Sequence, residues 1–139
     1  MTLFFEIYFN KVVAPNKSII ENLDIDFSVN SESESWSDYK YDFSNNCNNV
    51  AWEIVKKPTN NTSELRKAIK WSETSIEIQK DKHYLYDTLG QLYYLNNQKD
   101  KAIATQQKAI DLDENSDNET VYKTVLDQMK NGTYTKPLE

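Results

Sequence analysis

The chain has 139 residues, of which 38% are hydrophobic and 12% aromatic, enough for the core of one compact domain. Its net charge of -6 and its pI of about 4.9 disfavour nucleic acid or an anionic membrane as the main partner. With 2 Gly and 3 Pro, the composition favours helices over a strand-rich sandwich. No apolar run reaches the roughly 18 residues of a membrane-spanning helix, and the apolar opening lacks the basic segment of a signal peptide.

Residues 1–46 are expected to form an N-terminal helical segment that packs on the rest of the chain. Apolar residues recur at helical spacing over residues 2–13, where a strand is the alternative, and Pro15 ends this element. A second helix is expected over residues 17–30, although part of this stretch alternates apolar and polar residues as a strand does.

A third helix is expected to place Trp36, Tyr39 and Phe43 on one face, which leaves Tyr41 facing solvent or a neighbour. Asn45-Asn46 is expected to break the chain after it. This break sets the predicted boundary between the N-terminal segment and a unit that covers residues 47–132.

The first hairpin of that unit is predicted over residues 49–82. A helix at residues 48–57 is ended by Pro58. The next helix runs from Ser63 to about Gln79, and Asn61 with Glu64 three residues later predicts a capped start.

The second hairpin is predicted over residues 83–116, with a helix beginning at His83 and a polar turn after it. A glycine inside a helix costs about 1 kcal/mol relative to alanine, so Gly90 indicates close approach of the second helix. Asn97 is expected to cap that second helix. Small residues on its face, among them Ala102, would let it lie against Gly90.

A final helix is predicted to cover the open end of the hairpins. Ser116 and Glu119 form a capping-box pattern, and Gly132 ends the helix. Its apolar positions are Val121, Val125, Leu126 and Met129. Residues 133–139 are expected to be a tail whose last two residues look like a cloning scar.

The second hairpin resembles a tetratricopeptide repeat, whose period is about 34 residues. Tyr86 falls on an aromatic position of that repeat, Leu89-Gly90 on its Leu-Gly pair, and Ala102 and Ala109 on its two alanines. Gln106 replaces the usual aromatic residue, and Glu114 replaces the closing proline, so the match is incomplete.

An echo of this pattern lies one period earlier in the chain. Ala102 becomes Ala68, Ile103 becomes Ile69, and Tyr86 becomes Trp52. The sequence therefore predicts an all-α fold of antiparallel helical hairpins, stacked as a short right-handed tetratricopeptide-like array with a C-terminal capping helix.

Three phrases narrow the resemblance. They are Asn48-Asn49-Val50-Ala51-Trp52-Glu53, Ala68-Ile69-Lys70-Trp71-Ser72 and Tyr84-Leu85-Tyr86-Asp87-Thr88-Leu89. They resemble the helical C-terminal region that follows the thioredoxin-like domain in some exported thiol–disulfide proteins of Bacteroidetes. In that family a CxxC upstream carries the redox chemistry, and this chain has no CxxC. The resemblance therefore implies an accessory helical module rather than the activity.

The residues that could carry chemistry are few. Cys47 is a single cysteine, expected to be a small buried residue, and His83 has no His or Cys companion at metal-ligand spacing. Asp87 beside Thr88 is the best acid/base candidate, but a carboxylate that bonds a neighbouring helix or turn is the favoured interpretation. No enzyme activity, cofactor or metal is expected.

A peptide groove is the favoured site hypothesis. In tetratricopeptide repeats the first helix of each pair lines a concave groove, so the resemblance implies a groove containing Tyr84, Asp87, Gln91 and Tyr94 from the second hairpin. From the first hairpin it implies Val50, Glu53, Lys57 and Asn60. Tyrosines and carboxylates together suit a basic or extended peptide. The alternative is that Tyr84 and Tyr94 pack on the N-terminal helices and no groove is open.

The leading hypothesis is therefore a non-catalytic protein–protein interaction module, attached to a thioredoxin-like domain. The alternative is a domain of a thiol–disulfide enzyme whose catalytic CxxC domain lies outside this chain. A homodimer built on the aromatic N-terminal helices is a third hypothesis. Export to the periplasm is expected if a thioredoxin-like precursor precedes Met1, and a cytoplasmic location if Met1 is the native start.

Overall fold

A computed structural model describes residues 35–113 and 118–137, so the elements expected over residues 2–13 and 17–30 lie outside the described part. This part forms five α-helices and no strand, which confirms the predicted all-α fold. The helices are α3 (Trp36–Lys56), α4 (Thr62–Ile78), α5 (His83–Leu95), α6 (Lys99–Leu112) and α7 (Glu119–Asn131).

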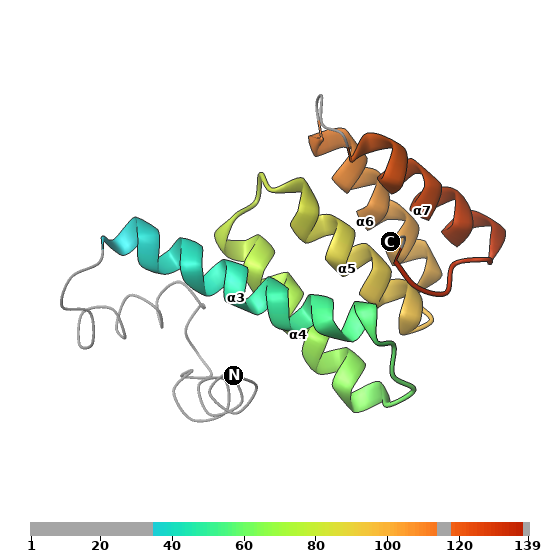
Figure 1. The fold of residues 1–139 in the computed structure, drawn as a ribbon, viewed down its shortest axis with the longest axis horizontal. Coiled ribbons are helices and arrows are strands. Elements are labelled where there is room, and N and C mark those ends of the chain that lie inside the picture. The colour runs from blue at the N-terminus through green and yellow to red at the C-terminus, as the bar shows by residue number, and fades with distance from the viewer. Residues whose placement is uncertain (1–34, 114–117, 138–139) are drawn as a thin grey trace.

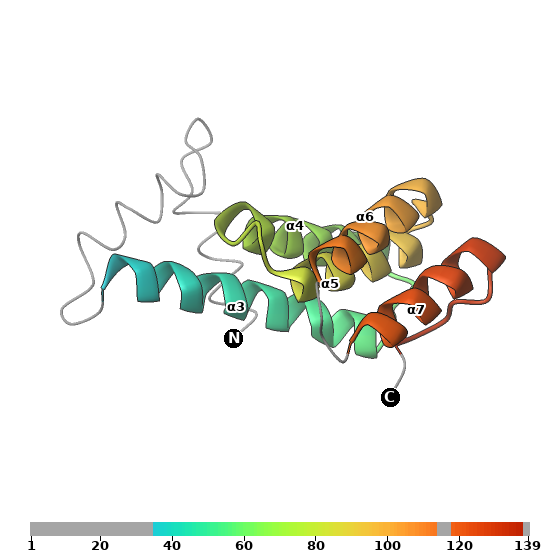
Figure 2. The ribbon, with the colours of Figure 1, turned by 90° about the horizontal axis from the view of Figure 1, so that it is seen from above.

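Each helix packs on the next along the chain, and α3 also contacts α5 (Figure 1). Figure 2 shows α4 and α6 on one side of the array and α3 and α7 on the other. The described part of the chain is thus built from two stacked hairpins, α3–α4 and α5–α6, followed by a single helix that packs on α6. This arrangement confirms the predicted tetratricopeptide-like array and the place of its last helix.

Helix α3 runs without interruption through Asn45-Asn46, so the predicted break there is wrong. The reason is a continuous apolar stripe. Phe43, Cys47, Ala51 and Val55 follow one another at four-residue spacing, and all four are buried. Their packing outweighs the modest helix-propensity cost of asparagine, which is under about 1 kcal/mol per residue. The boundary expected between residues 46 and 47 therefore falls inside a helix.

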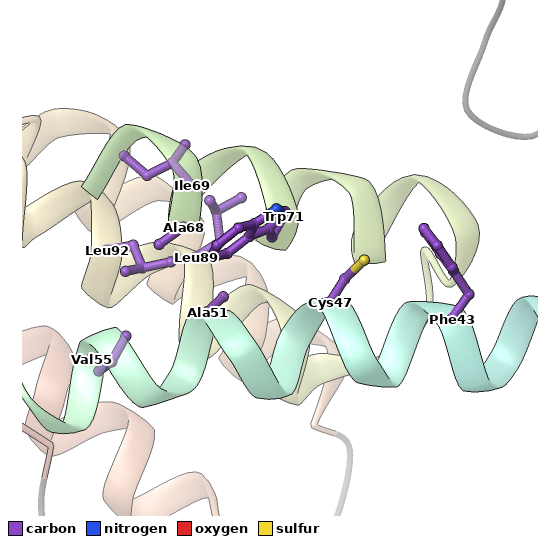
Figure 3. Packing of buried hydrophobic residues seen from close by; sticks show 9 residues of the cluster. All are labelled: Phe43, Cys47, Ala51, Val55, Ala68, Ile69, Trp71, Leu89 and Leu92. Carbon is purple, nitrogen blue, oxygen red and sulfur yellow. The ribbon is translucent and has the colours of Figure 1, made fainter. Parts of the chain in front are cut away.

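The stripe on α3 packs against α4 and α5 in one apolar cluster (Figure 3). Cys47 is fully buried within it, as predicted, and burial raises the pKa of its thiol. Trp71 of α4 is 6% exposed and supplies the largest side chain of the cluster. The cluster consists of Phe43, Cys47, Ala51, Val55, Ala68, Ile69, Trp71, Leu89 and Leu92.

The two hairpin turns use asparagine in different ways. Asn61 caps α4 as predicted, because its Oδ1 accepts hydrogen bonds from the backbone N–H groups of Ser63 (3.0 Å) and Glu64 (3.4 Å). Asn97 does not cap α6, so that prediction is wrong. It adopts a φ of 58°, a left-handed conformation that asparagine tolerates, and Gln98 precedes α6 without a side-chain cap.

Gly90 lies where α5 approaches α6, as its position predicted. A Cβ on Gly90 would be 2.9 Å from Oε1 of Gln106 and 3.2 Å from the backbone nitrogen of the same residue. The backbone oxygen of Ala102 would be 3.4 Å away. The absence of a side chain at Gly90 therefore lets α6 pack closely on α5.

Helix α7 ends at Gly132, whose φ of 74° is the left-handed conformation that glycine favours. The N–H of Thr133 donates to the carbonyl of Gln128, which completes a Schellman motif. At the other end Asn118 precedes Glu119 without a side-chain cap, and Ser116 lies outside the described residues.

The buried face of α7 differs from the predicted face at one position. Val121, one of the apolar positions expected in this helix, is 41% exposed, whereas Tyr122 is buried. Val125, Leu126 and Met129 are buried as predicted. Tyr134, in the stretch expected to be a tail, is 4% exposed and packs with Ala102, Val125 and Met129.

Candidate functional site

A buried polar cluster joins α5, α6 and the segment after α7. Asp87 is at its centre. The Nε2 of Gln91 donates to Oδ2 of Asp87 at 2.8 Å, and the Nε2 of Gln106 donates to Oδ1 at 2.7 Å. The hydroxyl of Tyr134 donates to Oε1 of Gln91 at 2.5 Å. These four buried residues are called the Asp87 cluster below.

The electrostatics of the Asp87 cluster follow from its burial. Burial raises the pKa of Asp87, while the hydrogen bonds from Gln106 and Gln91 and the positive charge of His83 oppose the rise. Burial and the negative charge of Asp87 both raise the pKa of Tyr134. Both hydrogen-bond donors to Asp87 are neutral amides. Neither donor is therefore a cation that could balance the charge of an ionised carboxylate.

A second polar cluster links the start of α5 to α7. The Nδ1 of His83 lies 2.9 Å from the hydroxyl of Tyr122, and its Nε2 lies 3.6 Å from Oδ1 of Asp113. The pKa of Tyr122 is raised by burial first, then by the negative charges of Asp87 and Asp113. His83 begins α5 as predicted.

An open pocket of about 210 Å³ lies beside the Asp87 cluster, between α3 and α5. Asn48 and Trp52 are four positions apart on α3, and Tyr84 and Thr88 are four positions apart on α5. Each wall of the pocket therefore comes from one face of its helix. Burial raises the pKa of the Tyr84 phenol, one of the two large aromatic groups of the wall. The pocket is lined by Asn48, Trp52, Tyr84, Asp87 and Thr88.

Hydrogen bonds hold the two hydroxyl groups that line the pocket, those of Tyr84 and Thr88. The hydroxyl of Tyr84 donates to Oδ1 of Asn45 at 3.1 Å, and that of Thr88 donates to the backbone oxygen of Tyr84 at 3.1 Å. The Oδ1 of Asn48 is buried and has no hydrogen-bond partner in the part of the chain that the structure describes. An unpartnered buried acceptor is costly, so Asn48 keeps an unused capacity to accept a hydrogen bond.

Of the groove residues predicted on α5, two line the pocket. Tyr84 and Asp87 do so directly. Gln91 is 1% exposed and lies behind Asp87, to which it donates. Tyr94 is half-buried at the other end of α5, where its ring packs edge-on against Tyr134 with centroids 5.3 Å apart.

The groove residues predicted on the first hairpin do not line the pocket. Glu53 and Lys57 are exposed near the end of α3. Glu53 pairs with Lys56, whose hydrogen bond lowers the pKa of the carboxyl. Val50 packs against the apolar cluster, and Asn60 is exposed in the loop between α3 and α4.

Sequence reasoning missed Asn48, Trp52 and Thr88 as lining residues, and Tyr134 as part of the Asp87 cluster. Thr88 had a signal, because it lies one helical turn after Tyr84, which was predicted for the groove. Tyr134 had none in its own surroundings, because its partner Gln91 lies on another helix.

No group of three or more His, Cys, Asp or Glu side chains suited to a metal ion occurs in residues 35–113 and 118–137. Among the helices of those two ranges, none is long and apolar enough to cross a membrane.

Residues 83–116 match the family model of the tetratricopeptide repeat. This stretch is thus similar to one tetratricopeptide repeat. It contains helices α5 and α6, and Gln106, which stands where the repeat usually has an aromatic residue, is the hydrogen-bond partner of Asp87. No match was found among curated proteins or among solved structures.

Two pairs of residues that lie one 34-residue period apart share their burial. Ala68 and Ala102, which lie one period apart, are both 0% exposed. Ala51 and Leu85, also one period apart, are likewise fully buried. The match itself covers α5 and α6 and leaves α3, α4 and α7 outside it.

Proposed function

We propose that the chain is a non-catalytic module that binds a protein partner through an extended peptide segment laid along α3 and α5. Tetratricopeptide repeats generally mediate protein–protein interaction, and stacked helical repeats bind on the surface that their neighbouring helices create. The observation that carries the proposal is the open pocket between the first helices of the two hairpins.

The composition of the pocket supports a peptide as the occupant. Trp52 and Tyr84 give it large aromatic surfaces, and such residues dominate the energetics of protein interfaces. Asp87 and Asn48 add polar groups that would fix the orientation of a bound chain.

A selection of random peptides on the full chain tests this proposal. Affinities of the enriched peptides are then measured by titration calorimetry for the wild type and two variants. Trp52→Leu removes an aromatic wall of the pocket and should weaken binding at least about tenfold. Tyr86→Leu changes a half-buried tyrosine of α5 that does not line the pocket, and it should leave affinity within about twofold. Equal losses in both variants, or no enriched peptide, would overturn the proposal.

A finer proposal is that this module is the C-terminal accessory region of a thioredoxin-like protein. It is supported by the three sequence phrases, which lie on α3, α4 and α5 in chain order. The alternative, a domain of a thiol–disulfide redox enzyme, shares the expectation that a CxxC-containing sequence is encoded upstream of Met1. Sequencing the native coding frame tests that expectation, and an upstream frame with no thioredoxin-like sequence would contradict both versions.

A further inference from the structure

We propose that the pocket between α3 and α5 receives an arginine or lysine side chain of the partner peptide, with Asp87 as its counter-charge. This inference rests on the proposed function, because it names the chemistry that the same pocket recognises. It does not follow from peptide binding as such, since a pocket of this size could equally have taken an apolar side chain.

The first argument is the electrostatic state of Asp87. Its side chain lines the pocket, yet the residue is only 8% exposed. A buried carboxylate is costly unless it is paired with a cation and hydrogen-bonded. Asp87 has hydrogen bonds from two neutral amides, those of Gln91 and Gln106. An ionised carboxylate offers about four acceptor sites, so roughly half of its capacity remains.

His83 lies one turn before Asp87 on α5, and in its protonated form it would favour the carboxylate. The ring nitrogens of His83 lie 2.9 Å from the hydroxyl of Tyr122 and 3.6 Å from Asp113, on the side of α7. His83 is not among the residues that line the pocket. A cation that enters between α3 and α5 would therefore meet Asp87 without displacing His83.

The remaining walls suit a long basic side chain. Trp52 and Tyr84 present aromatic rings, and a cation over such a ring is attracted by its quadrupole. Asn48 also lines the pocket, and its buried Oδ1 has no hydrogen-bond partner in residues 35–113 and 118–137. The volume of about 210 Å³ exceeds the roughly 150 Å³ of a cavity that holds benzene, so the pocket can hold one side chain.

Charge complementarity favours a basic side chain in the pocket over an acidic or an apolar one. An acidic side chain would place a second negative charge beside Asp87. An apolar side chain would displace water from Asp87 without offering a hydrogen bond or a charge in its place. The whole chain carries a net charge of -6, which favours the approach of basic peptides over longer distances.

A direct test uses a pair of synthetic pentapeptides, acetyl-Gly-Gly-Arg-Gly-Gly-amide and its counterpart with citrulline. Citrulline has nearly the shape of arginine but no charge. Each is titrated into the ¹⁵N-labelled full chain while the indole N–H resonance of Trp52 is followed, assigned by its loss in Trp52→Leu. The arginine peptide should shift this resonance with at least about tenfold higher affinity than the citrulline peptide. Equal shifts, or none with either peptide, would overturn the inference.

Two variants separate the pocket from the general acidity of the surface. Asp87→Asn removes one negative charge from the pocket, and Glu53→Gln removes one from the exposed end of α3. Asp87→Asn should abolish the preference for arginine over citrulline, whereas Glu53→Gln should retain it within about twofold. A preference that survives in Asp87→Asn would contradict the inference. If the amide spectrum shows that Asp87→Asn is unfolded, Asn48→Leu replaces it in this test. Asn48→Leu should lower the affinity for the arginine peptide at least about threefold.

The peptide selection described above then separates the inference from the proposed function. Enriched peptides that share a basic residue, and that Asp87→Asn no longer binds, would support both. Enriched peptides without a basic residue would leave the proposed function standing and overturn the inference. If no peptide is enriched, the proposed function fails, and the arginine and citrulline titration still decides whether the pocket recognises a cation.

Discussion

The two hairpins, α3–α4 and α5–α6, share an apolar cluster but differ in the polar groups that they bury. In α3–α4 the interior holds the large ring of Trp71, which is 6% exposed, and the small buried hydroxyl groups of Ser44 and Ser75, which donate to backbone oxygens. In α5–α6 the helices meet at Gly90, and the adjoining interior holds Gln106 and Asp87. The fully buried Ala68 and Ala102 are what the two interiors have in common.

This difference shows that the repeat geometry depends on a few small residues and leaves the rest of the interior free to change. Ala68 and Ala102 are fully buried, and an alanine occupies little space, so neighbouring helices can lie close to the second helix of each hairpin. The rest of the first interior combines apolar burial with small hydroxyl groups, such as that of Ser44, which bond to nearby backbone. The second interior holds a buried polar cluster, which is more demanding because each member must find a partner.

The largest effect that separates the hairpins is expected at Trp71. Trp71→Ala should lower the free energy of unfolding by about 3–5 kcal/mol, because it removes the largest side chain of the apolar cluster and leaves a cavity. The residue one period later is Thr105, which is half-buried, and Thr105→Ala should cost less than about 1 kcal/mol. Urea unfolding followed by circular dichroism measures both. Similar losses would mean that the first hairpin does not depend on its apolar interior.

Gly90 offers the converse comparison. Gly90→Ala should destabilise the protein by about 1–2 kcal/mol, because the new Cβ would push against Gln106 and disturb its bond to Asp87, which outweighs the helix propensity gained. Lys56, one period earlier, is exposed, and Lys56→Ala should stay within about 0.5 kcal/mol.

A second substitution shows whether the contact is the cause. In a Gln106→Ala background the Oε1 atom that lies 2.9 Å from the Cβ position is gone, so Gly90→Ala should cost less than it does in the wild type. A double-mutant cycle of unfolding free energies measures this coupling. Strictly additive values would show that Gln106 is not what requires glycine at position 90.

The polar interior of the second hairpin also predicts a role for the segment after α7. Tyr134→Phe should cost about 1–2 kcal/mol, because Oε1 of Gln91 would remain buried after losing its donor. The control is Tyr93→Phe, which removes a hydroxyl that donates to Glu73 at the surface and should cost less than about 0.5 kcal/mol. Thermal unfolding compares the two, and equal shifts would contradict the importance of the Asp87 cluster.

The fold could be predicted from the sequence because its decisive signals are local. Gly90 inside an amphipathic helix and Ala102 facing it indicated close helices, and the 34-residue echo indicated stacking. The continuity of α3 was not predicted, because two consecutive asparagines usually indicate the end of a helix. The apolar stripe from Phe43 to Val55 overrides this signal, and it is recognised only when the residues on both sides of Asn45-Asn46 are considered together.

The site was harder to predict than the fold because its contacts are long-range. Tyr84 and Asp87 were proposed for a groove, and both line the pocket, but the pocket's opposite wall comes from Asn48 and Trp52 on another helix. The buried Asp87 accepts a hydrogen bond from Gln106, 19 residues later, and no local sequence pattern predicts this pair. Whether the pocket binds a peptide stays a prediction.

The smallest expected difference between the hairpins lies at their turns, and it tests whether the repeat needs its caps. Asn61→Ala should cost about 1 kcal/mol, because α4 loses the side-chain acceptor of two backbone N–H groups. Gln98 occupies the corresponding place before α6 and makes no cap bond, so Gln98→Ala should change the free energy of unfolding by less than about 0.5 kcal/mol. Urea unfolding resolves the two values. If Gln98→Ala cost as much as Asn61→Ala, the start of α6 would depend on the side chain of Gln98 despite the lack of a cap bond. If Asn61→Ala costs more than Gln98→Ala, as expected, α6 is stabilised by its packing on α5 at Gly90, whereas α4 also depends on its cap.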